Sequence, residues 1–170
     1  MIDEFLLAKP VIRRGRDEGF NTKSSVQMKI SAKAEYACIA MLELAARYQK
    51  KVPVSIKVIA ETYDISAAFL MQIFMQLRGA GLLSSVRGSA GGFLLARAPE
   101  KINLEEIIEV IDGPQASSSA LTSLPGSALV RILQNIWQEV EESEKVILRE
   151  HTLVEILNQV PMGETFVYEI

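Results

Sequence analysis

The chain contains one cysteine, Cys38, and one histidine, His151, among its 170 residues. A lone cysteine cannot form an internal disulfide, and one thiol with one imidazole cannot complete a zinc site or an iron–sulfur cluster. One histidine also leaves few general bases that titrate near neutral pH. Since the chain has no Ser/His/Asp or Cys/His set and no phosphate-loop pattern, we expect neither a metal cofactor nor an enzyme.

Long apolar runs are also absent. No apolar stretch approaches the roughly 20 residues that a transmembrane helix needs. The N-terminus lacks the basic, apolar and small-residue order of a signal peptide. We therefore expect a soluble, cytoplasmic protein without membrane contact.

The net charge of −3 argues against a nucleic-acid partner until it is divided along the chain. Residues 28–97 carry nine Lys and Arg against four Asp and Glu, a net charge of +5. Residues 98–170 carry four against thirteen, a net charge of −9. A basic segment followed by an acidic one indicates two surfaces with different partners.

The basic segment reads as three helices. Ser31, Ser55 and Ser66 each precede an apolar stripe of helical period, as N-cap residues do. The first helix ends at the break formed by residues 50–53. The predicted inward stripe of the second helix is Ile56, Ile59, Ala60 and Tyr63, and that of the third is Leu70, Ile73, Phe74 and Leu77. The stripe of the first helix includes Cys38, which we interpret as a small core residue.

A glycine-rich hairpin follows the third helix. Two β-prone runs, residues 82–87 and 93–96, flank the sequence Gly-Ser-Ala-Gly-Gly at 88–92. Three helices followed by a hairpin are typical of a winged helix. We therefore predict a mainly α fold, a winged helix-turn-helix domain over residues 28–112 that is joined to a long C-terminal helix.

The remaining segments divide around that domain. Residues 1–27 read as a loose extension, with a basic arm as the alternative, and the serine-rich residues 113–127 read as a linker. Within the winged domain, Asn103 caps a fourth helix that ends at Asp112. The unit 128–170 comprises a helix from Leu129 to about Leu148, a short helix that the capping box of Thr152 and Glu155 starts, and a tail. The apolar stripe of the long helix is Leu129, Ile132, Leu133, Ile136, Trp137, Val140 and Ile147.

The third helix is the predicted reader of DNA. In a helix-turn-helix the second helix of the motif presents its first turns to the major groove. Gln72 is an outward residue whose amide suits adenine, although an ordinary solvated glutamine is the alternative, and Ala68 is small enough to approach a thymine methyl. Met71 either touches a base methyl or packs beneath the wing.

The hairpin tip and three polar residues are candidate backbone contacts. Arg87 supplies a cation for a phosphate or the minor groove, and the glycines let the main chain approach the sugar–phosphate wall. A plain hairpin is the alternative, but a simple turn needs at most two glycines. Lys33, Ser66 and Arg78 are further candidate phosphate contacts, with solvation as the alternative.

The chain resembles the Rrf2 family of bacterial transcription regulators from Met28 to about Val160. The resemblance lies in the sequence Met-Lys-Ile-Ser-Ala-Lys at 28–33, in Phe69–Gln72, in the wing sequence at 87–95 and in Trp137. It implies a homodimer on a pseudo-palindromic operator, with the long helix crossing its two-fold mate through the stripe named above. It also implies that Gln72 reads bases and that Arg87 acts in the wing, whereas Met71 stands where the family often has glutamate. The predicted DNA contacts are Lys33, Ser66, Ala68, Phe69, Met71, Gln72, Arg78, Arg87, Gly88, Ser89 and Gly91.

One departure from the family concerns sensing. Many Rrf2 regulators bind an iron–sulfur cluster through three cysteines, and the matching positions here hold Ser119, Pro125 and Arg131. The resemblance therefore implies a cluster-free regulator, most simply a repressor, that answers to a small-molecule effector or to a metabolic enzyme acting as corepressor. Residues 166–170 are a candidate docking segment for such an enzyme. The alternative is a winged helix used as a protein-interaction module, with the acidic C-terminal half as its working surface.

Overall fold

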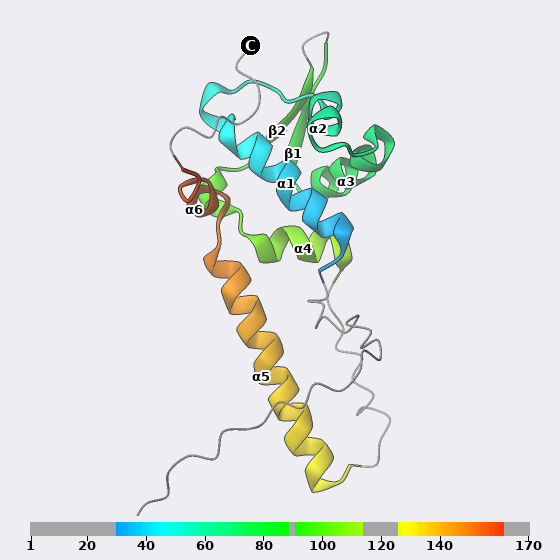
Figure 1. The fold of residues 1–170 in the computed structure, drawn as a ribbon, viewed down its shortest axis with the longest axis vertical. Helices are drawn as coiled ribbons and strands as arrows, with labels where there is room; N and C mark the ends of the chain where they lie inside the picture. Colours follow the sequence, from blue (N-terminus) through cyan, green and yellow to red (C-terminus); the bar gives the residue numbers. More distant parts are fainter. Residues whose placement is uncertain (1–29, 89–90, 114–125, 162–170) are drawn as a thin grey trace, which may run out of the picture.

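The structure, a computed structural model, describes residues 30–88, 91–113 and 126–161. Predictions for the extension 1–27, Ser89, Ser119, Pro125 and the docking segment 166–170 lie outside these ranges. The helices within them are α1 (Ala32–Ala46), α2 (Ile56–Tyr63), α3 (Ala67–Gly79), α4 (Leu104–Asp112), α5 (Ala128–Glu150) and α6 (Leu153–Leu157), with short 3₁₀ turns at Tyr48–Lys50 and Pro99–Lys101. An antiparallel pair, β1 (Leu83–Val86) and β2 (Gly92–Leu95), forms the wing. Figure 1 shows α1–α4 and the wing gathered into one body, from which α5 projects. The predicted mainly α winged fold with a long C-terminal helix is confirmed.

Side-chain caps start most of the helices where the sequence predicts. The Ser31 hydroxyl accepts a hydrogen bond from the Ala34 N–H, and the Asn103 side chain accepts one from the Glu106 N–H. Thr152 and Glu155 form the predicted capping box. Each such bond satisfies an amide that would otherwise lack an intrahelical partner. Ser66 occupies the N-cap position of α3, but its side chain makes no capping hydrogen bond.

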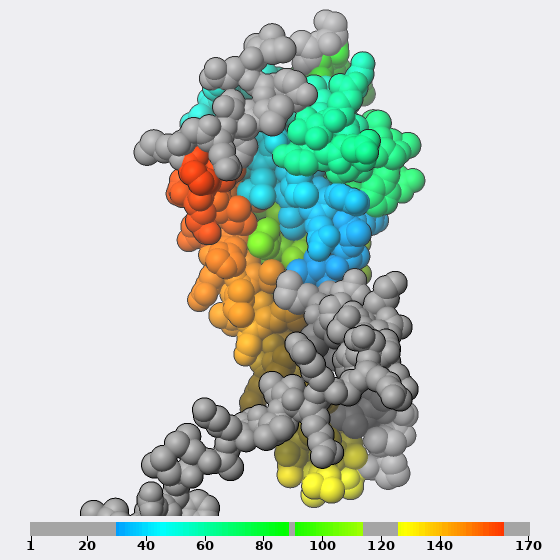
Figure 2. Space-filling view, viewed as in Figure 1, coloured from blue at the N-terminus to red at the C-terminus, as the bar shows by residue number. Residues whose placement is uncertain are grey.

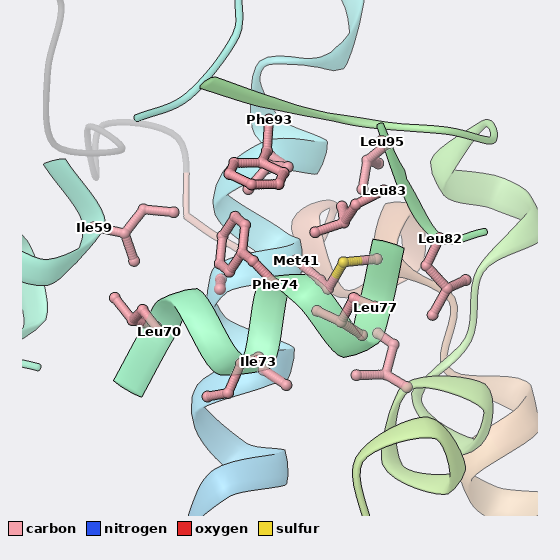
Figure 3. Packing of buried hydrophobic residues seen from close by; sticks show 14 of the residues in the cluster. Met41, Ile59, Leu70, Ile73, Phe74, Leu77, Leu82, Leu83, Phe93 and Leu95 are labelled. Carbon is pink, nitrogen blue, oxygen red and sulfur yellow. The ribbon is translucent and has the colours of Figure 1, made fainter. Parts of the chain in front are cut away.

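The core lies between α1, α3 and the wing. Met41, Leu70 and Phe74 are fully buried, and Figure 3 shows these side chains converging with residues of both wing strands. The Phe74 and Phe93 rings meet edge to face, with centroids 4.9 Å apart. Such a pair contributes about 1 kcal/mol beyond its burial, so it fixes the wing against α3.

The prediction that Tyr63 faces the core is wrong. Its side chain is 40% exposed, and its hydroxyl donates a hydrogen bond of 2.6 Å to Glu43 Oε1. Glu43 is itself buried and forms an ion pair with Arg47. The phenol hydroxyl bonds this carboxylate, and the ring remains partly exposed. Tyr63 therefore lies across the junction of α1 and α2. We call Glu43, Arg47 and Tyr63 the α1–α2 polar cluster.

The C-terminal helices differ in how they join the body. None of the α5 side chains is buried, although Arg149 near its end binds Glu105 of α4 through two hydrogen bonds. Leu153 of α6 is fully buried, and its N–H donates to the Ile102 carbonyl, so α6 packs on the body although the sequence groups it with α5. Figure 2 shows the N-terminal end of α5, in yellow, at the far end of the molecule from α6. Within the described ranges, no helix combines the length and apolar character that crossing a membrane requires.

Candidate nucleic-acid interface

A tight turn sets the angle between α2 and α3. Asp64 ends α2 with φ of 51°, in the left-handed region that aspartate tolerates better than most residues. The next residue, Ile65, is buried and donates its N–H to the Ala60 carbonyl. This anchor turns the chain so that α3 buries Leu70, Ile73, Phe74 and Leu77 and leaves its other face to solvent. The arrangement is that of a helix-turn-helix.

The outward face of α3 carries most of the predicted base-contacting residues. Ala68, Met71 and Gln72 are all exposed. Phe69 differs, because it is half-buried and its ring meets that of Tyr36 edge to face, with centroids 6.1 Å apart. Its observed contact is therefore with α1, and a DNA contact would use only the exposed part of its ring.

The predicted cationic contacts and several other arginines differ in their ion pairing within the described residues. Lys33, Arg78 and Arg87 form no ion pair within the part of the chain that the structure describes. By contrast, Arg47, Arg97 and Arg149 are each paired with a glutamate. Lys33 lies in the first turn of α1, Arg78 near the end of α3, and Arg87 directly after β1. Figure 1 shows α3 between the start of α1 and the wing, the two other elements that carry these cations.

The backbone geometry of the wing requires two of its glycines. Gly88 has φ of +122°, which side-chain-bearing residues rarely adopt. A Cβ on Gly91 would lie 2.5 Å from the Val86 carbonyl oxygen. Both glycines are therefore required by the hairpin itself, and the glycine count alone does not indicate DNA contact. Arg87 remains exposed beside them.

The connection between α1 and α2 lies beside the wing, a contact that the sequence did not predict. Val54 and Phe93 form an antiparallel bridge, with reciprocal N–H to carbonyl bonds of 2.9 Å. The bridge brings the connection between α1 and α2 beside β2, and this connection includes the exposed Lys50 and Lys51. The only signal in the sequence was the Lys-Lys pair before Val52 and Pro53, which we interpreted as a helix break. We add both lysines to the candidate phosphate contacts.

The cysteine on α1 is protected from ionisation. Cys38 is half-buried and packs against the core. Burial, the largest effect, and the nearby carboxylates of Asp112 and Glu35 together raise the pKa of its thiol from 9.0 to about 11. The thiolate is the reactive form of cysteine, so this side chain matches the predicted structural role.

The predicted dimerisation stripe lies open on α5. Its members are 42–73% exposed: Leu129, Ile132, Leu133, Ile136, Trp137, Val140 and Ile147. The helix spans 23 residues, or about 35 Å, and Figure 1 shows most of its length beyond the body. An apolar stripe of this size, interrupted only at Ser143, is unusual on a surface that faces only water.

Comparison with known proteins identifies one family of transcription regulators over most of the chain. The Rrf2 family model, described as an iron-dependent transcriptional regulator, matches residues 30–159. The transcriptional regulator CymR of Bacillus subtilis is 33% identical over 129 residues, which cover 76% of this chain and 89% of that protein. The transcriptional regulator IscR of Cereibacter sphaeroides is 33% identical over 135 residues, which cover 76% and 87% of the two chains.

Solved structures match over the same region. The structure of CymR, described as the global cysteine regulator of B. subtilis, superposes with a TM-score of 0.70 and 31% identity, covering 79% of this chain and all of that one. The likeness includes the winged body and the projecting helix.

Proposed function

This chain belongs to the Rrf2 family of transcription regulators, and on that basis we propose that it represses transcription as a homodimer bound to a specific operator. The family consists of helix-turn-helix DNA-binding regulators rather than enzymes. Beyond membership of the family, we propose four properties of this chain: sequence-specific binding, a homodimer, repression and the absence of an iron–sulfur cluster. Repression follows most simply, because a bound dimer would exclude polymerase from the DNA that it occupies.

The distribution of unpaired charge is the observation that carries this proposal. Lys33 on α1, Arg78 on α3 and Arg87 after β1 have no carboxylate partner among the described residues, although the whole chain is acidic. An unpaired cation loses no internal ion pair on meeting a phosphate, and each phosphate contact releases a counterion. In the proposal these cations, with Ser66 and the backbone at Gly88 and Gly91, position α3 on the duplex. Ala68, Met71 and Gln72 then meet base edges.

The homodimer is supported by the open stripe on α5. Apolar side chains that are exposed in one chain would be covered if α5 packed against the same helix of a second chain. Such an interface is two-fold symmetric, so it places two copies of α3 on one duplex and requires an inverted repeat in the operator.

The residues present do not fit an iron–sulfur cluster. Of the three positions that match the family's cysteine ligands, Arg131 is an exposed cation on α5 whose side chain donates to the Gly126 carbonyl. Cys38 is the only thiol in the whole sequence, and it packs into the body on α1. Among the described residues no group of three His, Cys, Asp or Glu could hold a metal ion. We therefore propose a cluster-free regulator whose signal is a small-molecule effector or a metabolic enzyme acting as corepressor.

A salt titration of DNA binding tests the proposal. Fluorescence anisotropy with a labelled duplex carrying a selected operator is measured between 50 and 200 mM salt, about the range over which phosphate contacts weaken strongly. We expect affinity to fall by at least about a hundredfold for the operator, and binding to a scrambled duplex to be weaker throughout. A flat salt response, or equal affinity for the two duplexes, would contradict sequence-specific DNA binding.

A further inference from the structure

Two methionines stand on the outward face of α3. Met71 is 46% exposed and Met75 is 44% exposed, whereas Leu70, Ile73, Phe74 and Leu77 of the same helix are fully buried. Residues four apart on a helix are neighbours, so the two thioethers form one apolar strip. The exposure of Met71 argues against the alternative that it packs beneath the wing. This strip lies on the same exposed face as Ala68 and Gln72.

The rest of that face is neutral. Ala68, Gln72 and Gln76 are exposed beside the methionines, and the first charge along α3 is Arg78. Arginine and lysine are the usual readers of guanine, and carboxylates accept a hydrogen bond from cytosine. This face offers neither in its first three turns. It offers amides, which pair with adenine, and methyl or thioether groups, which match the methyl group of thymine.

We propose that Met71 and Met75 read the 5-methyl groups of thymines in the major groove, beside an adenine bound by Gln72. The inference rests on the proposed function and assigns the base class that α3 recognises. A thymine methyl is apolar and projects into the groove, so its removal from water against a thioether is favourable. Removing one such buried methyl weakens binding about fourfold, and removing the symmetric pair from both half-sites weakens it about fifteenfold.

Deoxyuridine substitution tests this directly, because uracil differs from thymine only in the missing methyl. A duplex selected from random-sequence DNA by the wild-type protein is resynthesised with symmetric thymine-to-uracil changes, one pair at a time. We expect a loss of about fifteenfold at one or two positions per half-site and less than twofold elsewhere. Met71→Gln and Met75→Gln should each abolish the loss at one position, whereas Met71→Leu should retain it. Both methionines are partly exposed, so we expect each variant to fold as the wild type does. Its melting temperature and oligomeric state are measured as the control for folding.

The outcomes separate this inference from the function on which it rests. If the wild type binds the selected duplex specifically and every uracil change is neutral, methyl reading is wrong and the DNA-binding regulator stands. If Met71→Gln and Met75→Gln keep the full uracil sensitivity, other residues read the methyls and the assignment is wrong. If selection enriches no sequence, the proposed function fails and this inference fails with it.

Discussion

The Tyr63 hydroxyl donates a hydrogen bond of 2.6 Å to the buried carboxylate of Glu43 and joins the end of α2 to α1. Arg47, the residue directly after α1, pairs with the same carboxylate. Asp64, the residue after Tyr63, begins the turn into α3. The α1–α2 polar cluster therefore fixes the helix-turn-helix against the body at the point where its angle is set.

Glu43→Ala should be strongly destabilising, because it removes a buried carboxylate to which both Arg47 and Tyr63 bind. We expect a loss of about 3 kcal/mol in the free energy of unfolding. Tyr63→Phe removes one hydrogen bond and should cost about 1 kcal/mol. Urea unfolding at a fixed protein concentration measures both, with Lys57→Ala as a control, since its ion pair with Glu61 is fully exposed and should contribute less than about 1 kcal/mol. Equal losses for Glu43→Ala and Lys57→Ala would contradict this account.

The contribution of Tyr63 should also depend on pH. Burial and the bond to Glu43 raise the pKa of Tyr63 from 10.0 to about 12. The folded state thus favours the neutral phenol, so its stabilisation is complete below pH 10 and is lost as the pH rises towards 12. The stability difference between the wild type and Tyr63→Phe should shrink between pH 9 and pH 11. A difference that stays constant over that range would show that the phenol ionises equally in both states.

Cys38 should react slowly with alkylating agents. Its thiol pKa of about 11, against an ordinary value of 9.0, reduces the thiolate population at pH 8 by about a hundredfold. A thiolate of higher pKa is also more nucleophilic, which offsets part of this loss. Iodoacetamide labelling followed by mass spectrometry should therefore be about tenfold or more slower in the folded protein than in the protein unfolded by guanidinium. Rapid labelling of the folded protein would instead indicate an accessible redox-active cysteine.

Two arginines near the wing offer a matched test of the charge argument. Arg87 has no ion pair among the residues that the structure describes, whereas Arg97 is bound to Glu106. Arg87→Ala should weaken operator binding about tenfold or more and reduce the slope of log affinity against log salt by about one per half-site. Arg97→Ala should leave both nearly unchanged. If Arg87→Ala keeps full affinity while a Phe166→Ala or Tyr168→Ala change abolishes a protein complex, the interaction-module alternative gains support.

A charge placed in the stripe of α5 should separate the dimer. Ile136→Glu introduces a carboxylate among apolar residues that the proposed interface would bury, at a cost of several kcal/mol. Gln138→Glu adds the same charge on the nearly opposite face of α5, since two residues turn a helix by about 200°. Sedimentation equilibrium should find Ile136→Glu as a monomer and Gln138→Glu as a dimer. If the wild type is a monomer, or if both variants have the same oligomeric state, α5 is not the dimer interface.

Local features of this fold were predictable, and long-range ones were not. The caps at Ser31, Asn103 and Thr152 depend on residues within three positions, and the α3 stripe depends on a period of 3.6, so both can be read along the chain. The bond from the Ser31 N–H to Asp112 spans 81 residues, and nothing local to either residue indicates it. Tyr63 was misplaced for the same reason, because helical period assigned its ring inward without knowledge of the buried carboxylate on α1. Among the site residues, the exposure of Met71, Gln72 and Arg87 followed from periodicity and position in the wing, whereas the absence of ion pairs at Arg87 required the structure.

The most direct test of the account is selection of genomic DNA fragments with the purified protein, followed by sequencing of the bound fraction. Two α3 helices related by a two-fold axis predict an enriched inverted repeat, with half-site centres separated by about 10 base pairs or a multiple of that distance. Arg87→Ala should recover the same motif with weaker enrichment. Enrichment of no common sequence, or of a single half-site without an inverted partner, would contradict the claim that this chain is a dimeric, sequence-specific regulator.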